Sequence, residues 1–221
     1  MAKEGRTTAQ ADKSRTRREQ ILDAAFNTFA KRGYRDTAVD DIAEASDTSK
    51  GGVYFHFATK EAIFRELMRT TADRLAAKVD RAVASETEPI AKAEVALHTV
   101  LATFAGHRTM ARLLFLDALG AGRAFNVETN ELHDRFARLI AGYLDEAIAD
   151  GSIPAIDTAV TGVAWFGALN EVVARWLLAD EPGRLEDAYP TLRALLLRSV
   201  GVAEDRISSG QGAPGMPGAA R

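Results

Sequence analysis

The sequence predicts an all-α fold, with three helices in a small N-terminal domain and six in a C-terminal bundle. Apolar residues recur at the three- and four-residue spacing of helices along most of the 221 residues. No segment shows the alternating pattern of a half-buried strand, and capping residues, glycines and prolines separate the periodic segments. The length suits one extended or two small helical domains.

Composition excludes several classes of protein. Hydrophobic residues make up 47% of the chain, enough for a sizeable core, yet no apolar run is long enough to cross a membrane. We expect no secretion signal, because Met1–Arg18 is charged and lacks an apolar block. Without cysteine the chain has no disulfide and no thiolate metal site, which suits a cytoplasmic protein.

Charge is distributed unevenly along the chain. The net charge is -3, but residues 1–35 contain nine Lys or Arg and four Asp or Glu. Such an asymmetry is typical of one small domain that binds the phosphates of nucleic acid. For the first dozen residues, a solvated charged tail is the alternative. Residues 1–13 show no periodicity, so we expect a disordered basic arm that can add phosphate or minor-groove contacts.

The first expected helix begins at Ser14 or Thr16 and ends at Gly33, a residue suited to a left-handed stop. Two short helices then follow within Thr37–Lys60. In the first, Val39, Ile42 and Ala43 share one face, and Thr37 with Asp40 forms a pair resembling a capping box. Ser46-Asp47-Thr48 interrupts the pattern, and Ser49 caps a second helix over 50–56. This layout is typical of a helix-turn-helix DNA-binding motif.

The second short helix begins with Lys50-Gly51-Gly52, which is unusual. Each glycine costs about 1 kcal/mol relative to alanine in a helix interior. A helix whose first turn enters a DNA major groove benefits from little bulk, a positive charge and accessible backbone amides. We therefore expect Lys50 to donate to guanine N7 and O6, and both glycines to permit close approach.

Residues Arg17–Phe64 resemble the DNA-binding domain of the TetR family of transcriptional regulators. The resemblance rests on Arg32-Gly33-Tyr34, Thr37, Ile42-Ala43, Gly51-x-x-Tyr54-x-His56-Phe57 and Lys60-Glu61. Two positions depart from the family pattern: Asp47 replaces the usual turn glycine, and Thr48 replaces an apolar residue. Because aspartate tolerates the left-handed conformation better than most residues, we expect the turn to be preserved.

The resemblance implies contact roles for individual residues. The base-contacting positions match Lys50, Gly51 and Gly52, with Phe55 as an apolar partner for a thymine methyl group. The phosphate-contacting positions match Tyr54, His56 and Lys60, with Thr37, Thr48 and Ser49 as helpers. Packing is the alternative for Tyr54, and capping or packing is the alternative for His56. We expect Phe57 to lie in the core.

The rest of the chain predicts six further helices. They are expected at residues 60–84, 90–104, 110–119, 127–149, 158–179 and 185–200. The resulting domains are a helix-turn-helix DNA-binding domain (14–59), a helical effector-binding and dimerisation domain (60–203) and a disordered tail (204–221). This helix order is also what the TetR resemblance implies.

In the family, the last two long helices pack against their twins in a dimer, and the bundle encloses a mostly apolar effector pocket. The corresponding interface residues are Trp165, Trp176, Leu192, Leu195 and Leu196, and completion of the monomer core is the alternative for each. By helix position, the pocket residues are Phe104, His107, Met110, Leu114, Phe115, Trp165, Phe166 and Asn170. Ordinary core packing is the alternative for these residues, and Asn170 could instead form a hydrogen bond across the dimer interface.

No pattern for catalysis, a metal or a cofactor is found. The four histidines, His56, His98, His107 and His133, lack the spacing and acidic neighbours of zinc sites. Gly120-Ala121-Gly122 resembles the start of a dinucleotide-binding loop, but no strand precedes it and a third glycine is absent, which favours a helix break. We expect no cofactor and no enzymatic activity.

The sequence therefore favours a homodimeric transcriptional repressor that binds a double-stranded, pseudo-palindromic operator and is released by a small, mostly apolar effector. An activator or a ligand-independent regulator with the same DNA-binding domain is the first alternative. A helical enzyme or small-molecule binding protein is the second. No membrane partner is expected.

Overall fold

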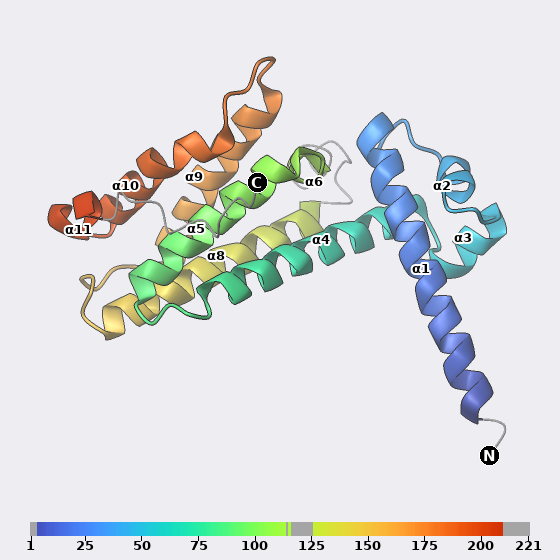
Figure 1. The fold of residues 1–221 in the computed structure, drawn as a ribbon, viewed down its shortest axis with the longest axis horizontal. Coiled ribbons are helices and arrows are strands. Elements are labelled where there is room, and N and C mark those ends of the chain that lie inside the picture. The colour runs from blue at the N-terminus through green and yellow to red at the C-terminus, as the bar shows by residue number, and fades with distance from the viewer. Residues whose placement is uncertain (1–3, 114, 116–125, 210–221) are drawn as a thin grey trace, which may run out of the picture. The chain divides into compact units, whose positions relative to one another are not determined.

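The structure is a computed structural model that describes residues 4–113, 115 and 126–209 (Figure 1). Within these residues all regular elements are helices, which confirms the all-α prediction. The chain divides into two compact units, one comprising residues 4–72 and the described residues of 112–128, and the other comprising 73–111 and 129–209. No helix in the described part of the chain is both long and apolar enough to cross a membrane.

The first unit contains three helices and the start of a fourth. They are α1 (Glu4–Arg32), α2 (Val39–Ala45), α3 (Lys50–His56) and the first half of α4 (Lys60–Val83). Helix α1 begins at Glu4, whereas the sequence predicted a disordered arm up to residue 13. An established helix extends at little cost through a segment that contains no proline, which accounts for the earlier start.

The core of the first unit includes the beginning of α4. Phe64 lies edge-on to Phe29 with ring centroids 5.4 Å apart, and 4.7 Å from the ring of Tyr34. Phe29 and Phe64 are fully buried, as is Ile42 of α2. The predicted domain boundary lies between residues 59 and 60, whereas in the structure the first unit continues to Ala72. The aromatic contacts of Phe64 explain why the start of α4 belongs with the first unit.

The second unit contains the rest of α4 and the remaining helices, except Arg112 of α6 and residues 126–128 of α8. They are α5 (Pro89–Gly106), α6 (Arg108–Arg112), α8 (Asn126–Ala149), α9 (Thr158–Leu178), the 3-10 helix η3 (Leu185–Ala188), α10 (Tyr189–Ser199) and α11 (Glu204–Ser209). Its largest core cluster joins Ile90, Leu144, Trp165, Leu196 and Ile207, one residue from each of five helices. The expected helix 110–119 lies largely outside the described residues.

One predicted helix is divided into two elements in the structure. The predicted helix over 185–200 is divided into η3 and α10, and Pro190 lies in the first turn of α10. Proline is compatible with a helix start but lacks the N–H needed within a helix, so the α-helix begins beside it.

The predicted disordered tail begins with a helix instead. Ile207 of α11 is 1% exposed, and its carbonyl accepts a hydrogen bond of 2.8 Å from Arg193 Nη1. The other terminal nitrogen of Arg193 donates to Glu94 Oε1 at 2.8 Å. Burial of Ile207 and this backbone contact hold the segment on the bundle. The rest of the expected tail, 210–221, lies outside the described residues.

Candidate nucleic-acid interface and ligand cleft

The turn between α2 and α3 is preserved despite its unusual residues. Asp47 adopts a left-handed conformation with φ of 50°, as expected for a residue that replaces glycine. The N–H of Thr48 donates to Ala43 O at 3.0 Å, and Ser46 Oγ donates to Ile42 O at 2.8 Å. Arg17 Nη1 also donates to Asp47 O at 3.3 Å. The prediction that aspartate would maintain the turn is confirmed.

The caps of the two short helices follow the prediction in part. Ser49 caps α3, since its Oγ accepts from Gly52 N at 3.0 Å. The predicted Thr37–Asp40 pair is wrong, because Ala38 is the N-cap of α2 and its N–H donates to Asp41 Oδ2 at 2.8 Å. Thr37 is 1% exposed and its hydroxyl donates to Gly33 O at 2.8 Å. Thr37 therefore stabilises the loop, and its side chain does not face solvent.

The two glycines of α3 have different surroundings. A Cβ at position 52 would lie 2.6 Å from Thr48 Oγ1 and 3.3 Å from Ser49 Oγ. A Cβ at Gly51 would meet only Ser49 Oγ, at 3.9 Å. The protein's own turn therefore favours glycine at position 52, whereas approach by DNA was the reason predicted for both glycines. Position 51 has no such internal requirement.

Helix α3 divides into a buried face and an outward face. Val53 is fully buried and Phe57, just after the helix, is 4% exposed, so the expectation that Phe57 lies in the core is confirmed. Phe55 is 81% exposed and Tyr54 is 44% exposed, an unusual display of aromatic area for one short helix. His56 is half-buried, with its ring edge-on to Phe55 at 5.1 Å.

Two lysines with predicted DNA contacts have different roles in the structure. Lys50 is exposed and its Nζ lies 2.8 Å from Asp40 Oδ2, a pairing that raises the pKa of Lys50. Lys60 Nζ donates instead to three backbone carbonyls, those of Tyr34 at 2.9 Å, Arg35 at 3.3 Å and Thr37 at 2.8 Å. An ammonium group has three donors. In this conformation Lys60 ties the loop between α1 and α2 to the start of α4, and none of its donors is left for a phosphate.

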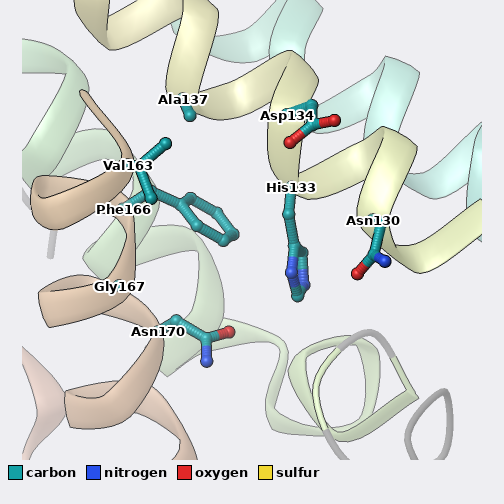
Figure 2. Close-up of a pocket in the computed structure, with 8 residues that line it drawn as sticks. All are labelled: Asn130, His133, Asp134, Ala137, Val163, Phe166, Gly167 and Asn170. Atoms are coloured by element: carbon teal, nitrogen blue, oxygen red, sulfur yellow. The ribbon is translucent and has the colours of Figure 1, made fainter. Parts of the chain in front are cut away.

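The second candidate site is a cleft of about 410 Å³ between α8 and α9 (Figure 2). Its lining residues are Asn130, His133, Asp134 and Ala137 of α8 and Val163, Phe166, Gly167 and Asn170 of α9. The rings of His133 and Phe166 lie 4.9 Å apart, and Phe136 stacks on Phe166 with centroids 6.2 Å apart. Burial lowers the pKa of His133, which favours a neutral imidazole with one donor and one acceptor.

The helices that form the cleft touch closely at one point. A Cβ on Gly162 of α9 would lie 2.5 Å from the carbonyl oxygen of Ala137 on α8. Ala137 also lines the cleft, whose other walls extend along α9 to Asn170. Gly162 thus allows the two backbones to meet beside the cleft, and the side chains beyond this contact leave the space open.

The cleft contains only two of the predicted pocket residues, Phe166 and Asn170. Phe104 and Trp165 are buried, 2% and 7% exposed, and the indole N–H of Trp165 donates to Ser199 Oγ at 3.0 Å. His107 is exposed at the end of α5, Met110 and Phe115 are half-buried, and Leu114 lies outside the described residues. The other six lining residues were missed, because the sequence does not show which faces of α8 and α9 lie opposite each other. The Asn130–His133 spacing on one helix face is the signal that could have found them.

Some of the predicted dimer residues are buried within the monomer, and others are exposed. Trp165, Leu192 and Leu196 belong to the monomer core, the alternative left open by the sequence. Trp176 is half-buried, with its indole N–H donating to Gly183 O at 2.8 Å and the guanidinium of Arg108 over its ring. Leu195 is 54% exposed. Sequence analysis missed three further exposed apolar residues on α9: Val160, Val163 and Leu178, at 65%, 58% and 68%.

Among the described residues, no group of three His, Asp or Glu side chains is placed to hold a metal ion. The surface around α3 presents a cation and aromatic rings beside exposed backbone. The cleft presents amide, imidazole and carboxylate groups beside an aromatic wall.

Two protein families match this chain. Residues 21–67 match the family described as bacterial regulatory proteins, tetR family, and residues 86–198 match the tetracyclin repressor-like C-terminal domain. The HTH-type transcriptional repressor KstR2 of Rhodococcus jostii is 33% identical over 165 residues, which are 68% of this chain and 79% of the relative.

Solved structures show the same fold. The fatty acid degradation regulator FadR of Bacillus halodurans has a TM-score of 0.75 at 25% identity, covering 81% of this chain and 97% of that one. The transcriptional regulator FadR of Bacillus subtilis, in complex with stearoyl-CoA, has a TM-score of 0.76 at 22% identity, covering 84% and 99%. The two family matches, the relative in Rhodococcus jostii and the shared fold all indicate the same family. The chain belongs to the TetR family of bacterial transcriptional regulators.

Proposed function

We propose that the chain is a homodimeric repressor that binds a pseudo-palindromic DNA operator through α3 and is released by a small effector. The observation that carries the proposal is the outward first turn of α3. Lys50 and Gly51 are exposed there, Phe55 is exposed in the last turn of the same helix, and Val53 and Phe57 anchor the helix in the core. A rigidly anchored helix with an open, cationic end suits the major groove.

Each exposed group of α3 fits one kind of DNA contact. The Lys50 ammonium can donate to guanine O6 and N7, and the Phe55 ring can contact a thymine methyl group. Backbone at Gly51 can approach base edges because no side chain intervenes. We propose that Tyr54 and His56 donate to phosphates, contacts that set the position of the helix without reading sequence. Ser49 and Thr48 flank this surface.

The exposed apolar residues of α9 and α10 supply a surface for a second copy of the chain. Val160, Val163 and Leu178 on α9 and Leu195 on α10 are each more than half exposed. Apolar surface of this kind favours association with a partner. A two-fold pair places two α3 helices on one DNA face, and half-sites about 34 to 36 Å apart then lie in successive major grooves.

The cleft between α8 and α9 is the proposed effector site. Phe166 and Val163 supply apolar contact, whereas Asn130, His133 and Asn170 supply hydrogen-bonding groups. The effector should therefore combine an apolar part with polar groups, which modifies the expectation of a mostly apolar ligand. Because the Bacillus subtilis regulator was solved with stearoyl-CoA, acyl-CoA thioesters are the first class to test.

The DNA proposal is tested by selecting fragments of the source genome with purified protein. We expect enrichment of a site with two inverted half-sites, a footprint centred on the dyad, and a stoichiometry of two chains per site. A reporter gene placed behind the recovered site then distinguishes repression from activation. Recovery of no preferred sequence, or binding by a single chain, would contradict the proposal.

The effector proposal is tested by titrating stearoyl-CoA and shorter acyl-CoAs into the operator complex, with free coenzyme A and free fatty acid as controls. Release can be no larger than the effector's differential affinity for the two states of the protein. Asn170→Leu should abolish the response, while Glu171→Gln, at the neighbouring exposed position, should preserve it. Equal responses of both variants would exclude the cleft.

A further inference from the structure

Asp40 on α2 is not the carboxylate that caps its own helix. It lies in the first turn of α2, but the carboxylate that caps this helix belongs to Asp41, which also pairs with Arg32 at 2.6 Å. Asp40 reaches across to the first turn of α3, where its Oδ2 lies 2.8 Å from Lys50 Nζ. Both side chains of this pair are more than half exposed.

We propose that Asp40 is a specificity-determining residue that directs the Lys50 ammonium toward base edges and away from the DNA backbone. The inference rests on the proposed DNA contact of Lys50. A lysine side chain is long and flexible. A free ammonium therefore interacts with the phosphates of DNA of any sequence as readily as with guanine. A carboxylate that accepts one of its three N–H groups restricts its direction and leaves two donors for guanine O6 and N7.

The charge of Asp40 acts in the same sense as the hydrogen bond. A carboxylate beside the entering helix repels the phosphates of all DNA alike, so its effect on discrimination comes through the lysine that it pairs with. An ammonium paired with it is a poorer partner for a backbone phosphate than a free one. Specificity is a difference of affinities, and a group that penalises the non-specific complex increases that difference.

Stability gives little reason for this pair. Ion pairs between exposed side chains contribute little to folding because water and salt screen them. Asp40→Asn keeps the size and shape of the side chain, so we expect a melting temperature close to that of the wild type. An effect on DNA discrimination can then be separated from an effect on folding.

The test compares Asp40→Asn with Glu44→Gln, which removes the same charge one turn further along α2 at another exposed position. Affinities are measured by fluorescence anisotropy on the recovered operator, on operators with single base-pair changes, and on scrambled DNA, at several salt concentrations. For Asp40→Asn we expect tighter binding to scrambled DNA and a loss of about fivefold or more in discrimination at one base pair of each half-site. Glu44→Gln should change the affinity for all DNAs by the same factor. Asp40→Glu should retain most of the discrimination.

A Lys50→Ala background completes the design. If Asp40 acts through Lys50, adding Asp40→Asn to Lys50→Ala should produce no further loss of discrimination. The inference is overturned if Asp40→Asn matches Glu44→Gln on every DNA, or if its loss of discrimination persists without Lys50. A wild-type protein that does not distinguish any recovered site from scrambled DNA would instead refute the proposed function.

Discussion

Alanine substitutions at Gly51 and Gly52 should have opposite effects on stability. At Gly51 the added Cβ meets only Ser49 Oγ at 3.9 Å, an ordinary contact. Alanine then gains helix propensity, stabilising the protein by up to about 1 kcal/mol. At Gly52 the Cβ would lie 2.6 Å from Thr48 Oγ1 and 3.3 Å from the capping Ser49 Oγ. Disturbing that cap should cost about 1 kcal/mol.

Urea unfolding of the two variants and the wild type, at one protein concentration, measures these changes. Thr48→Ala provides a control, because it removes the closest atom and leaves Thr48 Cβ, at 3.8 Å, as the remaining contact with that residue. Gly52→Ala should therefore be less destabilising when combined with Thr48→Ala than alone. The remaining 3.3 Å approach to Ser49 Oγ should leave part of the loss.

The same variants separate stability from DNA binding. Gly51→Ala should bind the operator at least about tenfold more weakly although it is folded and no less stable, because a methyl group at the helix end blocks approach to the base edges. Anisotropy titrations on operator DNA give the affinity. A Gly51→Ala protein that binds the operator like the wild type, or that is less stable than it, would refute this account of position 51.

Three further substitutions test the roles of other residues. Lys60→Met should lower the free energy of unfolding, measured with urea, by about 2 to 3 kcal/mol, because it removes a charged donor from three carbonyls. If stability is unchanged, phosphate contact becomes the better explanation of Lys60. Gly162→Ala should destabilise the protein by about 2 kcal/mol or more, because the added Cβ meets a backbone oxygen. Gly142→Ala is the control: its Cβ enters open space, so the change should be neutral or stabilising. Leu195→Glu should raise the dimer dissociation constant by about tenfold or more in analytical ultracentrifugation, and an unchanged constant would place the interface elsewhere.

The helices of this chain could be predicted where periodicity and caps agree. Helix α3 was placed at residues 50–56, its observed bounds, because Ser49 is a strong cap and Phe57 ends the pattern. Helix α9 begins at Thr158 as expected, with Asp157 Oδ1 accepting from Val160 N at 3.0 Å. These signals are local, since each depends on residues within a few positions of one another.

Contacts between distant segments could not be predicted in this way. Periodicity indicates that Trp165 lies on an apolar face, but it does not show whether that face packs on its own chain or on a partner. The sequence shows that Lys60 is charged and that His133 is polar. The groups that surround these side chains, however, depend on tertiary packing. The carbonyls around Lys60 come from residues more than twenty positions away.

The structure separates two groups of residues within the helix-turn-helix motif. Gly52, Ser49, Thr37 and Lys60 each make contacts inside the protein that account for their identity. A DNA contact is not required to explain any of them.

For the other group, internal contacts offer no such explanation. Phe55 is 81% exposed, and Gly51 gives up helix propensity with space for a side chain. Lys50 contacts only a neighbouring exposed carboxylate among the hydrogen bonds and ion pairs described for it. An exposed aromatic ring and an unnecessary glycine are both costly in a free protein, since one leaves apolar area in water and the other weakens a short helix. Their combination on one short helix is best explained by a partner that covers the ring and comes close to the backbone. We therefore propose that the DNA-contacting surface is centred on Lys50, Gly51 and Phe55 and does not include Lys60.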